Sequence, residues 1–94
     1  LMRAIAAAKG QEQTAQAEHD RIEDDRSREY AEQERLRENL AAVPKDGDLG
    51  RRYLARLARS EDQLEALAKA QGAASAKVEA ARAALAKLVR EAQI

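Results

Sequence analysis

A cluster of helix-breaking residues decides the fold, because it interrupts a helix-forming chain near its middle: Val43-Pro44-Lys45-Asp46-Gly47-Asp48-Leu49-Gly50. Pro44 lacks a backbone donor and disfavours the helical conformation at Val43. Gly47 supports a tight turn, and Asp46 or Asp48 is expected to cap the helix that follows. The cluster therefore predicts helices over about residues 2–43 and 49–92, joined by a turn over 44–48.

Outward from this turn, a stripe of residues recurs in alternating steps of three and four on each side. We call the two stripes together the seam. Before the turn it consists of Leu1, Ile5, Ala8, Glu12, Ala15, His19, Ile22, Arg26, Glu29, Gln33, Leu36, Leu40 and Val43. After the turn it consists of Gly50, Tyr53, Leu57, Ser60, Leu64, Leu67, Gln71, Ala74, Val78, Ala81, Leu85, Leu88 and Ala92. The first stripe is polar in its middle and the second is nearly continuous, a pattern typical of a coiled coil.

The two stripes match when the chain is folded back at the turn. Leu36 then lies opposite Leu57, and Ala15 lies opposite Val78. Residues 1–43 carry seven basic and ten acidic side chains, whereas residues 44–94 carry ten and seven. Opposite net charges favour pairing of the two arms, although single exposed pairs contribute little. The sequence predicts an all-α fold, an antiparallel two-helix coiled-coil hairpin in one domain over residues 1–94.

Composition narrows the functional classes. The chain has no cysteine, which excludes disulfides and thiolate metal sites, and it leaves the compartment open. Its net charge is zero, whereas a dedicated nucleic-acid binder usually has a basic excess. No apolar run approaches the roughly 18 residues of a membrane span. Leu1 stands before Met2, which suggests a tag remnant or an internal start, the latter in a fragment of a longer protein.

Catalytic and metal-binding patterns are weak. His19 is the single histidine, and with Glu23 it supplies at most half of a metal site, so we expect a polar seam residue. Asp24 and Asp25 are paired carboxylates, but acid–base catalysis needs a pocket that a solvated helix lacks. Asp24 is instead expected to support the helix through Arg28, four residues on. We predict no catalytic, metal-binding or cofactor-binding residue, no small-molecule substrate and no enzyme activity.

Two surfaces remain as candidates for binding. Arg51, Arg52, Arg56 and Arg59 form a basic stripe suited to phosphates, but Glu34 is expected opposite Arg59 and Glu38 near Arg56, which favours internal pairing. The second surface widens the seam on one side and is the predicted protein interface: Met2, Tyr30, Leu54, Leu64, Leu67, Ala68 and Val89. Leu64 and Leu67 belong to it because Glu29 and Arg26 match them poorly. A second copy, giving a four-helix dimer, or adjoining domains of a parent protein would cover it.

Residues around the turn carry a resemblance: Gln33-Glu34-Arg35-Leu36-Arg37-Glu38-Asn39-Leu40, Arg52-Tyr53-Leu54-Ala55-Arg56-Leu57 and Ser60-Glu61-Asp62-Gln63-Leu64-Glu65-Ala66-Leu67. They resemble the coiled-coil region of a bacterial family of unknown function, some of whose members are labelled mucoidy-inhibitor-like. The resemblance implies a helical arm beside β-rich domains and a bacterial source, but no activity. We therefore expect a structural or protein-interaction arm. The alternatives are a binder of nucleic acid or anionic surfaces through the basic stripe, and a helical chaperone or secretion adaptor.

Overall fold

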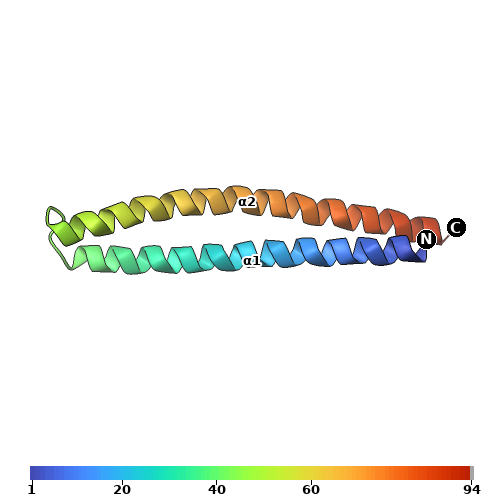
Figure 1. Ribbon diagram of the computed structural model, residues 1–94, viewed down its shortest axis with the longest axis horizontal. Coiled ribbons are helices and arrows are strands. Elements are labelled where there is room, and N and C mark those ends of the chain that lie inside the picture. Colours follow the sequence, from blue (N-terminus) through green and yellow to red (C-terminus); the bar gives the residue numbers. More distant parts are fainter. Residues whose placement is uncertain (94) are drawn as a thin grey trace. The chain divides into compact units, whose positions relative to one another are not determined.

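A computed structural model describes residues 1–93 and contains two helices, α1 (Met2–Ala41) and α2 (Asp48–Ala92), with no strand in that range (Figure 1). The helices run in opposite directions on either side of the turn, which confirms the predicted all-α helical hairpin. Internal contacts divide the chain into a terminal unit, Leu1–Glu23 with Ala70–Ile94, and a turn unit, Asp24–Lys69.

The first helix ends at Ala41, two residues earlier than the sequence predicted. The N–H groups of Ala42 and Val43 bond to the carbonyls of Asn39 and Leu40, three residues back, at 3.2 and 3.3 Å. Such tightened bonds are typical of a helix end. Pro44 therefore affects the two residues before it, and not only its immediate neighbour.

The second helix begins at Asp48, and its capping residue differs from the prediction. The carbonyl of Gly47 accepts the N–H of Arg51 at 3.0 Å, so Gly47 occupies the capping position and neither aspartate does. Gly47 also donates its own N–H to the carbonyl of Pro44 at 3.3 Å, which closes the turn. Asp48 lies in the first helical turn, where the helix dipole favours a negative charge.

Gly50 is buried where the turn folds back on the first turn of α2. A Cβ atom at this position would lie 2.2 Å from the carbonyl oxygen of Pro44 and 2.9 Å from the Cα of Lys45. Both neighbours are backbone atoms that cannot rotate away. The close approach therefore requires glycine at position 50.

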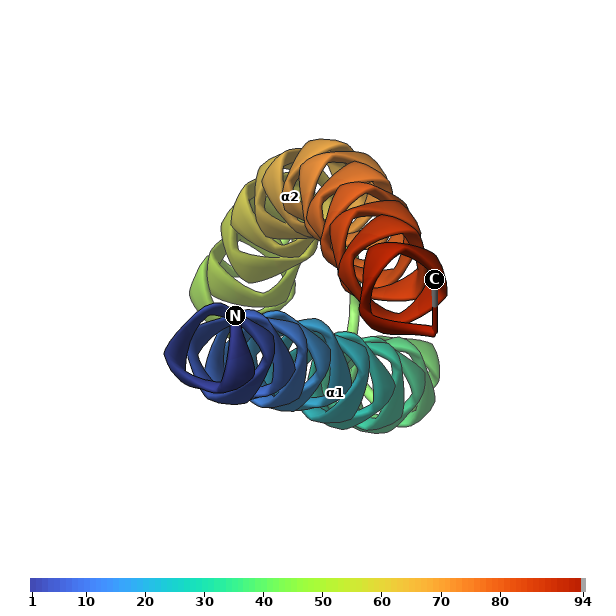
Figure 2. The same ribbon diagram turned by 90° about the vertical axis from the view of Figure 1, so that its right-hand side faces the viewer.

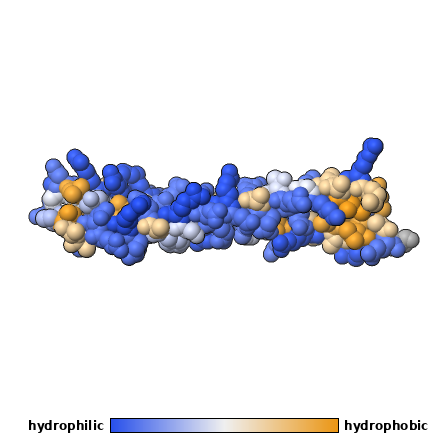
Figure 3. All heavy atoms as spheres, turned by 90° about the horizontal axis from the view of Figure 1, so that it is seen from below, coloured by the Kyte–Doolittle hydropathy of each residue, from blue (hydrophilic) through white to orange (hydrophobic). Residues whose placement is uncertain are grey.

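Alanine and β-branched side chains form the interior of the terminal unit, which Figure 2 views from the end where α1 begins and α2 ends. Ala8 and Ile22 of α1 are buried there together with Ala74 and Val78 of α2. Apolar side chains also gather on the surface at this end of the unit (Figure 3), where Leu1 and Met2 are exposed. The helices of this unit therefore pair over a thin apolar strip.

The interior of the turn unit combines leucines with polar side chains. Leu36 and Leu64 are buried there, and so are Gln33 and Ser60. Across the described residues, every buried side chain or glycine lies on the seam: Ala8, Ile22, Gln33, Leu36, Gly50, Ser60, Leu64, Ala74 and Val78. The spacing of three and four thus identified the inward faces of both helices.

Candidate functional site

A polar layer crosses the turn unit, and we define it as Glu29, Gln33, Ser60 and Glu61. Gln33 and Ser60 are buried, Glu29 is half-buried and Glu61 is exposed. Gln33 is 2 % and Ser60 is 4 % exposed. The hydroxyl of Ser60 donates to Oε1 of Glu29 at 2.6 Å, and Nε2 of Gln33 donates to Oε1 of Glu61 at 2.8 Å. Both bonds join α1 to α2, so the buried polar groups gain partners across the seam, as buried polar groups require.

The polar residues in the middle of the seam are not left unmatched, contrary to what the sequence had suggested. Glu29 was expected to face Leu64 as a charge without a match, but its long side chain reaches the hydroxyl of Ser60 instead. Leu64 is only 8 % exposed, so it has little surface left for a second chain. The guanidinium carbon of Arg26 lies 6.0 Å from the ring centroid of Tyr30, at the outer limit of a cation–π contact.

The predicted interface residues fall into two groups. Met2 and Val89 belong to the terminal unit, and Tyr30, Leu54, Leu64, Leu67 and Ala68 belong to the turn unit. Met2 is 78 % and Tyr30 is 53 % exposed, and Leu54, Ala68 and Val89 are exposed as well. Leu64 is buried and Leu67 is partly buried. The exposed members are available to a partner, whereas the two seam leucines already contribute to the hairpin.

Three arginines of the basic stripe form a row on one flank of α2. Arg52, Arg56 and Arg59 directly precede seam positions and are exposed. The predicted pairs Glu34–Arg59 and Glu38–Arg56 do not form, and within residues 1–93 none of the three arginines has an ion pair or hydrogen bond. Glu34 follows a seam position and Arg59 precedes one, so they lie on opposite flanks. Arg51 differs, because its Nη2 lies 3.4 Å from the carboxylate of Asp48.

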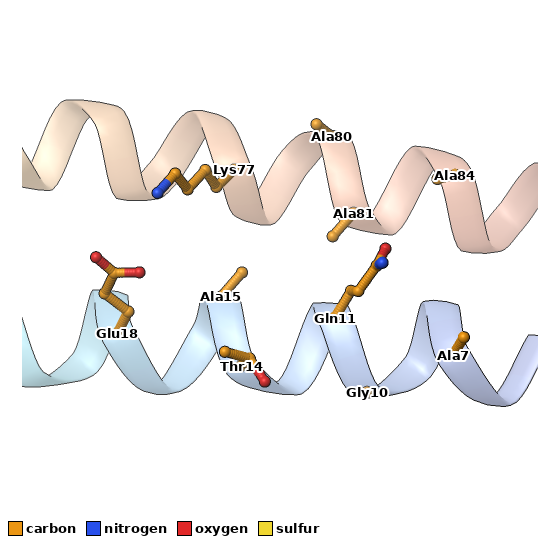
Figure 4. Close-up of a pocket in the computed structure, with 10 residues that line it drawn as sticks. All are labelled: Ala7, Gly10, Gln11, Thr14, Ala15, Glu18, Lys77, Ala80, Ala81 and Ala84. Carbon is orange, nitrogen blue, oxygen red and sulfur yellow. The ribbon is translucent and has the colours of Figure 1, made fainter.

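A groove lies between α1 and α2 of the terminal unit (Figure 4). We call it the alanine groove. Its volume is about 700 Å³, and its lining consists of Ala7, Gly10, Gln11, Thr14, Ala15, Glu18, Lys77, Ala80, Ala81 and Ala84. Glu18 of α1 and Lys77 of α2 lie on opposite walls near one end, as Figure 4 shows. Neither has a hydrogen bond or ion pair to any described residue.

The other flank of the terminal unit is bridged, and its hollow is smaller, about 250 Å³, with a lining that includes Gln16, His19 and Arg82. Nη2 of Arg82 donates to Oε1 of Gln16 at 3.0 Å. Nε2 of Gln71 donates to the carboxylate of Glu23, also across the two helices. This asymmetry was not predicted, although the sequence carries a signal for it: four small residues directly precede seam positions, namely Ala7, Thr14, Ala80 and Ala84.

Among the described residues, His19 and the carboxylates Asp24 and Asp25 are not part of a metal-binding group of side chains. Nε2 of His19 is 3.8 Å from Glu23, and Nδ1 is 3.5 Å from Asp20. In the part of the chain described, no three histidine, cysteine, aspartate or glutamate side chains are placed to hold a metal ion. Arg28 pairs with Asp25 at 3.6 Å and not with Asp24 as predicted, because the arginine reaches the carboxylate three residues back.

Neither helix, over its described residues, is long and apolar enough to cross a membrane. No protein-family model, no curated protein and no solved structure matches this chain.

Proposed function

We propose that this chain is a non-catalytic structural or protein-interaction arm whose two helices pair as a coiled coil. The observation that carries this proposal is the distribution of burial. Among the described residues, everything buried lies on the seam, so the interior serves only to join α1 to α2. The other described side chains are partly or fully exposed.

The polar layer supports the arm in a second way. An active site needs polar groups that are free to act on a substrate. Here Gln33 and Ser60, the two buried polar side chains among the described residues, are engaged with glutamates of the opposite helix. Polar residues at seam positions are a known means of fixing alignment in coiled coils at some cost in stability.

The partner of the arm is proposed to bind exposed apolar residues, and the turn unit offers Tyr30 and Leu54. A test immobilises the chain and captures proteins from extracts of its source cells. The variant Tyr30→Ser/Leu54→Ser should lose captured proteins that dock on this unit. The control Ala31→Ser/Ala55→Ser alters exposed neighbours on the outer face and should retain them. Equal capture by both variants, or no capture by the unaltered chain, would contradict the proposal.

A second candidate function is binding of a polyanion through Arg52, Arg56 and Arg59. The observation that favours it is that these exposed arginines have no partner within residues 1–93. Two of them, Arg56 and Arg59, line a hollow of about 300 Å³. Carboxylates of Glu29 and Glu32 line the same hollow and weaken its attraction for anions.

Heparin chromatography tests this second function. Changing the three arginines to glutamine should lower the salt concentration of elution, because fewer counterions are then displaced. The matched control, Arg3→Gln/Lys87→Gln/Arg90→Gln, removes the same charge from exposed positions of the terminal unit and should elute near the unaltered chain. Identical shifts for both variants would show an effect of net charge alone.

A further inference from the structure

We infer that the alanine groove of the terminal unit binds a second copy of this chain, with α1 of each copy packed on α2 of the other. The inference rests on the proposed function, because it names one partner of the arm. It assigns the contact to a surface that the sequence analysis did not identify.

The lining of the groove allows close approach of another helix. Ala7, Gly10, Ala80 and Ala84 have no side-chain atom beyond Cβ. A Cβ added at Gly10 would meet no atom within 4 Å, so the wall is open at that point. Separations between packed helices range over roughly 8–10 Å, according to the size of the side chains in contact. These four residues favour the short end of that range where they form the walls, whereas Gln11 and Thr14 carry longer polar side chains at the same groove.

The floor of the groove is formed by seam residues whose apolar surface is still partly exposed to water. Ala15 and Ala81 lie on the seam, yet both remain partly exposed through the groove. Within the same unit, Ala74 and Val78 are fully buried. A second copy packed on this flank, with its own groove facing this one, would remove these apolar surfaces from water, which stabilises association by about 25 cal/mol per Å².

Charge identifies the occupant as a second copy. Glu18 on the α1 wall and Lys77 on the α2 wall have no partner among the described residues. A two-fold axis parallel to the helices places α1 over the partner's α2. Each Glu18 then meets a Lys77 of the other copy, and the contact occurs twice. Residues 1–43 are acidic overall and residues 44–94 are basic, so the same arrangement brings opposite charges together more widely.

The exposed area is sufficient for such an interface. The chain exposes 6809 Å². A compact monomer of 10.3 kDa exposes about 5400 Å². The excess is larger than the roughly 800 Å² that each partner contributes to a standard interface. Pairing two copies would therefore bring the exposed area per chain close to the usual value.

From the sequence, a second copy was expected on the flank of Met2 and Val89, which directly follow seam positions. In the terminal unit that flank is bridged by the bonds Arg82–Gln16 and Gln71–Glu23. A second helix there would have to displace or cover these polar groups. The alanine groove, on the opposite flank, presents no such bridge.

Sedimentation equilibrium tests the groove directly. The unaltered chain should sediment with the mass of two copies at tens of micromolar. Ala80→Gln fills the groove while keeping helix propensity, and it should reduce the mass to one copy. The matched control Ala83→Gln changes an exposed alanine outside the lining and should leave the two-copy mass. A one-copy mass for the unaltered chain, or equal masses for the two variants, would overturn the inference.

Charge reversal tests the arrangement of the copies. Glu18→Lys and Lys77→Glu each place like charges in contact across the proposed interface, so each variant alone should dimerise at least tenfold more weakly. Their equimolar mixture should recover the two-copy mass, because both contacts are then attractive. Recovery would not follow if Glu18 and Lys77 acted only within one chain. A monomeric chain that still captures proteins through Tyr30 and Leu54 would overturn this inference alone and leave the proposed arm function standing.

Discussion

At the scale of single residues, Gly50 is the glycine of the described chain at which a side chain would meet the closest backbone atoms. Its missing side chain lets the carbonyl of Pro44 approach the first turn of α2, where a Cβ would be 2.2 Å away. Gly72 is the contrasting case, because it is exposed in the middle of α2 and an added Cβ would meet nothing within 4 Å. The same residue type therefore has opposite effects at the two positions.

The first prediction compares these glycines. Gly50→Ala should lower the free energy of unfolding by about 3 kcal/mol, because the backbone must move to admit the methyl group. Gly72→Ala should raise it by about 1 kcal/mol, since alanine is the better helix former. Urea unfolding followed by circular dichroism measures both. A Gly50→Ala variant as stable as the unaltered chain would show that the turn adapts easily.

The second prediction concerns the bond between Ser60 and Glu29. A double-mutant cycle with Ser60→Ala and Glu29→Ala should give a coupling energy of about 1.5 kcal/mol, because the bond has a charged acceptor and is partly buried. The control cycle pairs Ser60→Ala with Glu32→Ala, which lies one turn further along α1, and should give a coupling near zero. A coupling near zero in both cycles would mean that solvent replaces the Ser60 hydroxyl without loss.

At the scale of the elements, the periodicity predicted which faces of the helices point inward, and the structure confirms that. It did not predict the helix ends or the flanking contacts. The end of α1 depends on Pro44 and the start of α2 on Gly47, and both involve loop geometry that periodicity does not contain. Glu34 was expected to pair with Arg59 because of its level along the hairpin, but the flank on which each side chain lies decides the contact.

The third prediction tests the alignment of α1 with α2 inside the turn unit. Cysteines at Leu36 and Leu57 should form a disulfide within one chain on mild oxidation, because these positions lie opposite each other. Cysteines at Leu36 and Leu64 should not, since the second position is shifted by two turns, about 10 Å along the helix, which exceeds disulfide reach. Gel mobility without reductant distinguishes the two. Preferential linkage of 36 with 64 would require a shifted alignment.

At the scale of the whole molecule, stability and association are expected to be linked. Residues such as Ala15 and Ala81 remain partly exposed in a single copy, so part of the apolar gain is available only after pairing. Anything that binds the folded chain and not the unfolded chain raises its apparent stability by mass action. A second copy acts as such a ligand for the first.

The fourth prediction follows from this linkage. The melting temperature of the unaltered chain should rise as its concentration increases from about 1 to 100 µM, because pairing favours the folded form. The Ala80→Gln variant should melt at one temperature throughout that range. Thermal scans at several concentrations provide the measurement. If the melting temperature of the unaltered chain did not change with concentration, pairing would not contribute to its stability, and the prediction would be wrong.

The tight turn at Gly50 also determines whether α1 pairs with α2 of the same chain or with α2 of another molecule. The layers of the seam, including the bond between Ser60 and Glu29, form equally well when α1 pairs with α2 of another molecule. Only the folded connection at Pro44 and Gly50 favours pairing within one chain. A substitution that straightens this connection should therefore leave the helices intact and produce a domain-swapped dimer, in which two chains exchange their second helices.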